Sequence, residues 1–458
     1  MTQSNSGSTS RREFLKNTGC MAVASAMAGG AVPLVHAAEN NTINVALIGC
    51  GGRGTGAAAD ALSVDQGPVK LVALADVFED RVRNSYENLK NQYANQMDVP
   101  QDRQFVGFDG FQKAMDCLKP GDVAIFATPL AFRWVHFAYA VQKGLNVFME
   151  KPLTADAPTS RRMLQTAEES VAKNLKVGVG LMSRHSRALQ QLHDRIQDGE
   201  IGDIVAMRAY RMTGPVGSAF SEKWPGQPSE LLWQIQRFHS FLWASGGSFN
   251  DFYIHVIDHC CWMKNAWPVK AQAVGGRHYR GNCIDQNFDS YAVEYTFADG
   301  AKLFMDGRCI AGCQDIYNSY AHGTKGSAIV SKHGDCGAPS STYKGQNPDP
   351  AALIWESKIP RDQGNPYRNE WNDLVDAIRN DKPFNEAKRG IEASLVSSLG
   401  RKAAHTGQEI TYEEMLNSPE EYAPGVDKFT MDSPPPLVAD AEGKYPIPMP
   451  GIKKTTEY

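Results

Sequence analysis

Short apolar runs alternate with helical patterns through the first part of the chain. Each run has the length and composition of a strand that is covered on both faces, and the stretches between them have helical spacing. The runs lie at residues 43–48, 69–75, 122–127 and 147–149, and the helical patterns between them lie at 55–62, 78–94 and 134–143. A further helical pattern at 157–172 and an apolar run at 176–181 lead into the second domain. Strands and helices in this alternation predict a parallel, doubly wound sheet in an α/β domain.

Later strand signals alternate apolar and polar residues with a period of two. They lie at residues 204–212, 269–277, 290–297 and 301–309, and Ala298-Asp299-Gly300 has the composition of a hairpin turn between the last two. Two helical patterns follow, at residues 371–379 and 391–404. We therefore predict a second, α+β domain with an open, mostly antiparallel sheet, one face of which is available for a ligand or a partner subunit.

These patterns divide the chain into four parts. The predicted divisions are a leader at residues 1–37, a first domain at 42–164, a second domain at 165–417 and a tail at 418–458. The tail is rich in proline, with Pro434-Pro435-Pro436 at its centre. A chain of this composition is expected to wrap a surface of the protein or of a neighbouring subunit rather than fold alone.

Composition excludes several classes of partner. The 458 residues are 42% hydrophobic and 21% charged, with a formal net charge of −4, so no basic surface for nucleic acid is expected. After the leader, no run approaches the roughly 18 apolar residues that a membrane span needs. The nine cysteines include no CxxC pair, which gives no zinc pattern, and no disulfide pairing is assigned.

The N-terminus has the features of an export signal. Ser10-Arg11-Arg12-Glu13-Phe14-Leu15-Lys16 contains a twin arginine, a weakly apolar stretch follows at residues 21–35, and Val35-His36-Ala37 provides a small-residue cleavage site. We expect the twin-arginine (Tat) export machinery to carry the folded protein to the periplasm. A cofactor would then be acquired in the cytoplasm, before export.

A glycine-rich turn joins the first predicted strand to the first predicted helix. Residues 49–54 read Gly-Cys-Gly-Gly-Arg-Gly, which is the G-x-G-x-x-G pattern of a Rossmann dinucleotide-binding turn. Gly49 permits the tight turn, Gly51 allows the backbone to approach a pyrophosphate, and Gly54 allows the helix to pack on the strand. Asp76 ends the second strand, where a carboxylate binds a ribose diol and repels a 2′-phosphate, so NAD(H) is the expected cofactor.

The run at 147–149 leads into Glu150-Lys151-Pro152. Ligands of open α/β sheets bind beyond the carboxyl ends of the strands, so this tripeptide places a carboxylate and an ammonium at the edge of a nucleotide cleft. Taken alone, it is also consistent with a surface ion pair before a loop proline.

A second group of polar residues follows a double glycine at 246–247. On a helix, Asp251, His255 and His259 share one face, and Asp258 lies beside them. A neutral imidazole is a suitable base near neutral pH, and Asp251 could orient it. The alternatives are an ordinary capped, partly buried helix and a divalent metal site. The spacing matches no recognised zinc pattern, and we predict no metal.

These motifs together resemble the glucose–fructose oxidoreductase / inositol dehydrogenase (Gfo/Idh/MocA) family, and its exported twin-arginine members in particular. The resemblance covers roughly residues 42–417 and departs at Leu130, where many members have Asn or Asp. The matching residues are Gly49–Gly54, Asp76, Thr128-Pro129, His136 and Glu150-Lys151-Pro152.

The resemblance implies a role for each group of residues. Lys151, Asp251 and His255 are the expected catalytic residues. Arg184, His185, Asp258 and His259 are candidates for binding substrate, although Arg184 and His185 fit a structural role equally well. The expected cofactor-binding residues are Gly49, Gly51, Gly52, Arg53, Gly54, Asp76, Thr128, Pro129, Glu150 and Lys151. The open sheet and the family together indicate a homo-oligomer.

The leading interpretation is an NAD(H)-dependent oxidoreductase that acts on a secondary hydroxyl of a carbohydrate or polyol. Because free NAD is not expected in the periplasm, the cofactor should be held tightly and regenerated within each turnover. One alternative is redox-neutral cleavage of a glycoside by transient oxidation and elimination. Another is a nucleotide-binding protein without catalysis, against which the presence of Lys151, Asp251 and His255 argues.

Overall fold

The computed structural model describes residues 41–278, 280–334 and 339–458, and all of them belong to one compact unit. The predicted leader at residues 1–37 lies outside the described residues. Within the described residues, no helix combines the length and apolar character needed to cross a membrane.

The first half of the chain forms a six-stranded parallel sheet with the order β3-β2-β1-β4-β5-β6, which confirms the predicted doubly wound fold. Its central strands are buried on both faces, as their apolar composition predicts. The strands are β1 (Ile43–Ile48), β2 (Val69–Asp76), β3 (Gln104–Val106), β4 (Val123–Phe126), β5 (Asn146–Met149) and β6 (Val177–Val179). The helices between them are α2 (Gly52–Leu62), α3 (Glu79–Tyr93), α4 (Gly110–Asp116), α5 (Arg133–Gln142) and α6 (Ala157–Ala172).

The predicted boundary at residue 164 is wrong, because the first sheet continues beyond it. Strand β6 pairs in parallel with β5, where Phe148 lies opposite Gly178. A helix from much later in the chain, α11 (Pro366–Arg379), then packs against β6 and α2. Its Trp371 ring lies 4.6 Å from the ring of Phe148. The first domain is therefore completed by a segment that the sequence division had assigned to the second.

The second sheet has nine strands in the order β14-β13-β12-β11-β7-β10-β9-β8-β15. Strands β7 and β10 pair in parallel and the other neighbours pair antiparallel, which confirms the open, mostly antiparallel prediction. The strands are β7 (Ile204–Thr213), β8 (Lys270–Gly276), β9 (Ser290–Thr296), β10 (Lys302–Cys309), β11 (Ile316–Gly323), β12 (Gly326–Ser331), β13 (Ser341–Lys344), β14 (Leu353–Glu356) and β15 (Ile410–Thr411).

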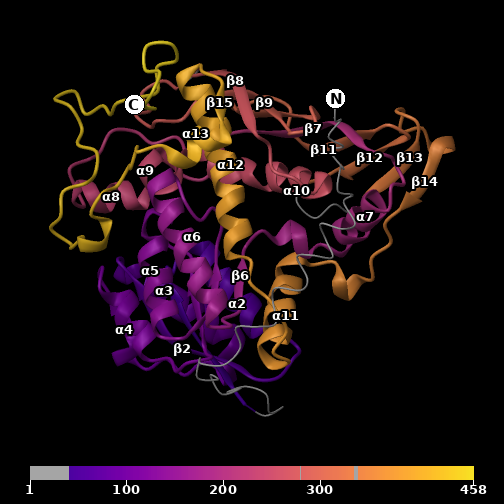
Figure 1. Ribbon diagram of the computed structural model, residues 1–458. Helices are drawn as coiled ribbons and strands as arrows, with labels where there is room; N and C mark the ends of the chain where they lie inside the picture. Colours follow the sequence, from indigo (N-terminus) through magenta and orange to yellow (C-terminus); the bar gives the residue numbers. More distant parts are fainter. Residues whose placement is uncertain (1–40, 279, 335–338) are drawn as a thin grey trace, which may run out of the picture. The chain divides into compact units, whose positions relative to one another are not determined.

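Helices cover one face of this sheet and connect it to the first domain. Helix α10 contacts β7 and β11, while α12 contacts β8 and β9 on one side and α6 on the other (Figure 1). The helices of this half are α7 (Arg187–Gln197), α8 (Glu230–Gln236), α9 (Leu242–Ser245), a π-helical turn (Phe249–Tyr253), α10 (Ile254–Lys264), α12 (Ala387–Thr406) and α13 (Tyr412–Asn417). The two domains thus share one continuous packing arrangement.

The tail packs against its own chain. Tyr422, Val426 and Tyr445 are buried in an apolar cluster that also contains Phe132 and Trp243. Short 3-10 turns lie at Leu130–Phe132, Met182–His185, Phe238–Ser240 and Val426–Lys428. The tail is drawn in yellow in Figure 1, where it runs beside α8 and α9.

Candidate active site

A cavity of about 890 Å³ lies at the carboxyl ends of the parallel strands, where ligands of such sheets bind. Its wall also includes residues of the second domain and of the tail. All ten residues predicted to bind the cofactor line it, as do the predicted catalytic residues Lys151, Asp251 and His255. The structure therefore brings these two sets of residues together, while their roles stay predictions.

The glycine turn forms the floor of the cavity. Gly49 has a φ of +98°, and a Cβ atom there would lie 2.6 Å from the carbonyl carbon of Ala127, so no other residue fits without a shift. Apart from the adjoining backbone, no atom of the described residues lies within 4 Å of the Cβ positions of Gly51 and Gly52. Helix α2 begins at Gly52, so its N-terminal amides and the positive end of its dipole face open space.

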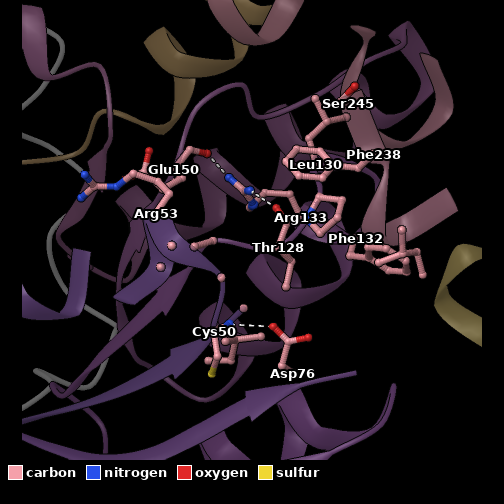
Figure 2. Close-up of a pocket in the computed structure, with 18 of the residues that line it drawn as sticks. Cys50, Arg53, Asp76, Thr128, Leu130, Phe132, Arg133, Glu150, Phe238 and Ser245 are labelled. Carbon is pink, nitrogen blue, oxygen red and sulfur yellow. Dashed lines mark hydrogen bonds and ion pairs between the residues drawn. The ribbon is translucent and has the colours of Figure 1, made fainter. Parts of the chain in front are cut away.

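Asp76 connects the end of β2 to this turn. Its carboxylate accepts a hydrogen bond from the backbone N–H of Cys50 at 2.7 Å (Figure 2). It accepts a second from the backbone N–H of Phe78 at 3.1 Å. Burial raises the pKa of Asp76 above its usual value. Arg81 lies over the ring of Phe78 at 4.6 Å and also lines the cavity, so a cation is available close to this carboxylate.

Glu150 supports the glycine turn from the other side. Its carboxylate pairs with Nε of Arg53 at 2.8 Å. A Cβ at Gly180 would lie 2.6 Å from the carboxylate, so the glycine leaves the room that Glu150 occupies. The acid of Glu150-Lys151-Pro152 thus holds an arginine of the turn in place.

Arg133, which the sequence analysis did not identify, holds the ends of β4 and β5 together. Its guanidinium donates to the carbonyl of Thr128 at 2.6 Å and to the carbonyl of Glu150 (Figure 2). Burial lowers the pKa of Arg133 to about 10, which leaves the side chain charged at neutral pH. The strand ends that carry Thr128 and Lys151 are therefore fixed relative to each other.

Lys151 crosses from the first domain to the second. Its Nζ donates to the backbone carbonyl of Asp251 at 2.6 Å and lies 3.3 Å from Oδ1 of the same residue. The other carboxylate oxygen lies 3.0 Å from Nε2 of His239. Burial alone would raise the pKa of Asp251, but Lys151 and His239 outweigh it and hold that pKa well below its usual range.

His239 is a second residue that the sequence analysis missed. The backbone N–H of Ser218 donates to its Nδ1 at 3.2 Å, so the neutral ring carries its proton on Nε2 and donates it to Asp251. Gly217 makes room for the ring, because a Cβ there would lie 2.7 Å from it. No periodic pattern surrounds His239 in the sequence, so only the fold could place it beside Asp251.

His255 lies one turn along from Asp251 and lines the same cavity. Burial and then the Lys151 ammonium lower the pKa of His255 well below its usual value, which keeps the imidazole neutral near neutral pH. Its Nδ1 atom is buried and has no hydrogen-bond partner among the residues that the structure describes. A neutral imidazole with an unmet ring nitrogen can accept or donate one proton to a ligand.

The four residues predicted to bind substrate lie away from the described cavity wall, so the structure does not support that placement. Arg184 pairs with Asp258 through two bonds of 2.7 and 2.8 Å. His185 lies between Asp373 and Glu386, and His259 bonds Ser319 at 2.7 Å. His259 lies one turn of α10 beyond His255, and its bond to Ser319 directs it toward the sheet rather than the cavity.

The residues present fit a nicotinamide dinucleotide. The open glycine turn at a helix N-terminus suits a pyrophosphate, Asp76 lies where a ribose would be bound, and the cavity continues to Lys151 and His255. Among the described residues, no group of three His, Cys, Asp or Glu side chains is placed to hold a metal ion.

This fold and cavity define a two-domain, dinucleotide-binding α/β protein. Two family models match it: "Oxidoreductase family, NAD-binding Rossmann fold" over residues 43–181 and "GFO/IDH/MocA C-terminal domain" over residues 189–329. The chain belongs to the Gfo/Idh/MocA family of oxidoreductases.

Individual relatives are distant. Inositol 2-dehydrogenase of Corynebacterium glutamicum is 26% identical over 101 residues, which are 22% of this chain and 29% of that protein. The aldose-aldose oxidoreductase of Caulobacter crescentus, solved with glycerol, has a TM-score of 0.61 and 15% identity over 81% of this chain and all of the other. GenD2 from gentamicin A biosynthesis, solved with NAD, has a TM-score of 0.58 and 19% identity over 82% of this chain and 97% of the other. These solved structures share the fold with this chain.

Proposed function

We propose that this protein is an NAD(H)-dependent oxidoreductase that acts on a secondary hydroxyl of a carbohydrate or polyol. One observation carries the proposal: Lys151, from the dinucleotide-binding half, lies 2.6 Å from the carbonyl oxygen of Asp251, from the other half, in the cavity that contains His255. The relative named inositol 2-dehydrogenase supports a polyol substrate, although the match spans less than a third of that protein's length.

The charge states of these residues suit alcohol oxidation. A bound nicotinamide ring supplies the hydride acceptor. The Lys151 ammonium donates a hydrogen bond to the substrate oxygen and stabilises the negative charge that develops on it. Neutral His255 accepts the hydroxyl proton, and Asp251, held by Lys151 and His239, stays ionised and keeps the ammonium in position.

Further parts of the proposal rest on the sequence and on the open second sheet. The twin-arginine motif supports export to the periplasm, and export supports a tightly held cofactor that is regenerated within each turnover. The open second sheet supports a homo-oligomer. Asp76 supports NAD rather than NADP, because its carboxylate would repel a 2′-phosphate.

The central test is Lys151→Met. We expect turnover on a responsive sugar or polyol to fall about 100-fold or more, because the donor to the developing alkoxide is lost. Lys90→Met, on the exposed surface of α3, is the matched control. A panel of sugars, polyols and glycosides, read by absorbance of bound reduced nicotinamide, identifies the substrate. Glycoside cleavage without net reduction would indicate the redox-neutral reaction, and unchanged turnover in Lys151→Met would contradict the proposal.

A further inference from the structure

Two side chains of the second sheet face the reacting end of the cavity. Arg211 on β7 lies directly opposite Tyr317 on β11 in the antiparallel pairing of these strands. The Arg211 guanidinium lies 4.0 Å from the centre of the Tyr317 ring, and both residues line the cavity. The two side chains therefore form one feature of the cavity wall.

The packing of α10 on the sheet places this pair beside His255. Ser319, two residues after Tyr317 and on the same face of β11, bonds His259 of α10 at 2.7 Å. His255 lies one helical turn before His259 on α10, and Tyr317 lies two residues before Ser319 on β11. The contact between His259 and Ser319 therefore places His255 near Tyr317. The positive charge of Arg211 contributes to the lowered pKa of His255, as expected for neighbours.

Three polar atoms around this point lack a partner. Nε of Arg211, the hydroxyl of Tyr317 and Nδ1 of His255 are buried, and none has a hydrogen bond to any residue in the described part of the chain. Buried polar atoms are normally paired, so an unpaired group of three on one wall indicates that a ligand completes them.

The charges at this wall do not balance. Lys151 is paired with Asp251, but Arg211 forms no ion pair with an acid in the described ranges. Arg208, on the same strand, pairs with Asp306 at 2.6 Å. The cavity thus presents one uncompensated guanidinium next to the proposed base.

We propose that the substrate is a sugar or polyol acid, whose carboxylate binds Arg211 while Tyr317 donates to it. This rests on the proposed function and names its substrate class. A guanidinium presents its Nε–H and Nη–H donors in a planar fork that matches a carboxylate, and one Arg with one neutral hydroxyl suits a single negative charge. A phosphate dianion would need more donors than this wall offers.

The experiment measures sugar binding to the nucleotide-loaded protein by calorimetry. Glucuronate is compared with glucose, galacturonate with galactose, and mannuronate with mannose. Glucose 6-phosphate is included as a phosphorylated sugar. We expect at least one uronate to bind about 10- to 100-fold more tightly than its neutral counterpart. Arg211→Gln should remove that preference, so that the uronate binds no more tightly than its neutral counterpart, and Tyr317→Phe should reduce the preference by a smaller factor.

Arg208→Gln is the matched control, since it removes an arginine of the same strand that already has an acid partner, and it should keep the preference. Arg211→Lys keeps the charge without the fork and should give an intermediate preference, which also shows that the site folds. Equal binding of acids and neutral sugars, tighter binding of the phosphate, or a preference that survives Arg211→Gln would overturn the inference.

The two proposals fail in different ways. Turnover of neutral sugars without any preference for acids would refute the sugar acid and leave the oxidoreductase proposal intact. Arg211-dependent binding of a uronate without reduction of bound nicotinamide would support the acid site and count against the oxidoreductase.

Discussion

Individual residues at the reacting end of the cavity have charge states that their neighbours set. Asp251 stays ionised because Lys151 and His239 both contact its carboxylate, although burial opposes this. His255 stays neutral because burial and two cations disfavour its protonated form. The site thus offers the ionised Asp251, the cations Lys151 and Arg211, and a neutral base near neutral pH, which is a combination that suits proton removal from an alcohol.

Asp76 supplies a prediction at this scale. Replacing it with Ser removes the carboxylate that would repel a 2′-phosphate, while Arg81 stays in the cavity wall as a cation. We expect the affinity of nucleotide-free protein for NADP to rise and that for NAD to fall, by about tenfold each. Calorimetric titration with the two nucleotides measures the ratio. Glu79→Ser replaces an exposed acid in the first turn of α3 and should leave the ratio of the two affinities unchanged. An unchanged ratio in Asp76→Ser would show that Asp76 does not select the cofactor.

Elements whose signal is local were predictable from the sequence. Strands β1, β2, β4 and β5 are continuous apolar runs between breakers, and β9 and β10 alternate around a turn of Asp299 and Gly300. The sequence analysis missed β3 and α4, because three and seven residues are too short to show a period. It also treated residues 251–259 as one α-helix, whereas the structure begins that segment with a π-helical turn.

The site was predictable as far as its residues form motifs. The glycine turn, Asp76, Lys151, Asp251 and His255 have fixed spacings, and the structure places them in one cavity. His239, Arg211 and Tyr317 have no such spacing, since only the folded chain brings β7, β11 and the 3-10 turn Phe238–Ser240 to one cavity. Arg184 and His259 were misplaced because polar residues near a site motif can equally well be buried among structural partners.

His185 provides a prediction about how elements are joined. It bonds Asp373 of α11 at 2.7 Å and Glu386, just before α12, at 3.2 Å, and these carboxylates raise its pKa to about 8 against the burial that opposes them. The pKa of His185 in the folded protein exceeds the value of about 6.5 expected in the unfolded chain. The contacts of protonated His185 therefore contribute fully to the free energy of unfolding below about pH 6.5, and this contribution is lost as the pH rises through about 8.

The rise in the pKa of His185 corresponds to about 2 kcal/mol in the free energy of unfolding. We therefore expect thermal unfolding of His185→Asn to depend less on pH between about 6.5 and 9 than that of the natural protein. The comparison is made by scanning calorimetry at a series of pH values. His193→Asn, at a half-buried histidine of α7 that stacks on Trp262, should keep the pH dependence of the natural protein. If the unfolding temperatures of His185→Asn and the natural protein changed with pH in the same way, the contacts of His185 with Asp373 and Glu386 would contribute nothing to the pH dependence of stability.

At the scale of the whole molecule, the tail links the second domain to the nucleotide side of the cavity. Val426, Asp427 and Phe429 line the cavity, and the Phe429 ring lies about 6 Å from those of Phe108 and Phe132. Further along, the fully buried carboxylate of Glu457 pairs with the equally buried Arg401 and bonds His405. This buried ion pair fixes the end of the tail and, through it, the segment that covers the cavity.

Glu457→Gln therefore tests whether the tail retains the cofactor. The change leaves the buried Arg401 guanidinium without its counter-charge, which typically costs about 3 to 5 kcal/mol, so the tail should detach locally before the domains unfold. We expect bound nucleotide to exchange at least about tenfold faster, measured by its release into an excess of competing NAD. Glu442→Gln, an exposed acid in the same tail, should exchange at the natural rate. If proteolysis shows the tail detached in Glu457→Gln while release stays slow, then the tail does not hold the nucleotide, and retention must come from the glycine turn and the residues around Asp76.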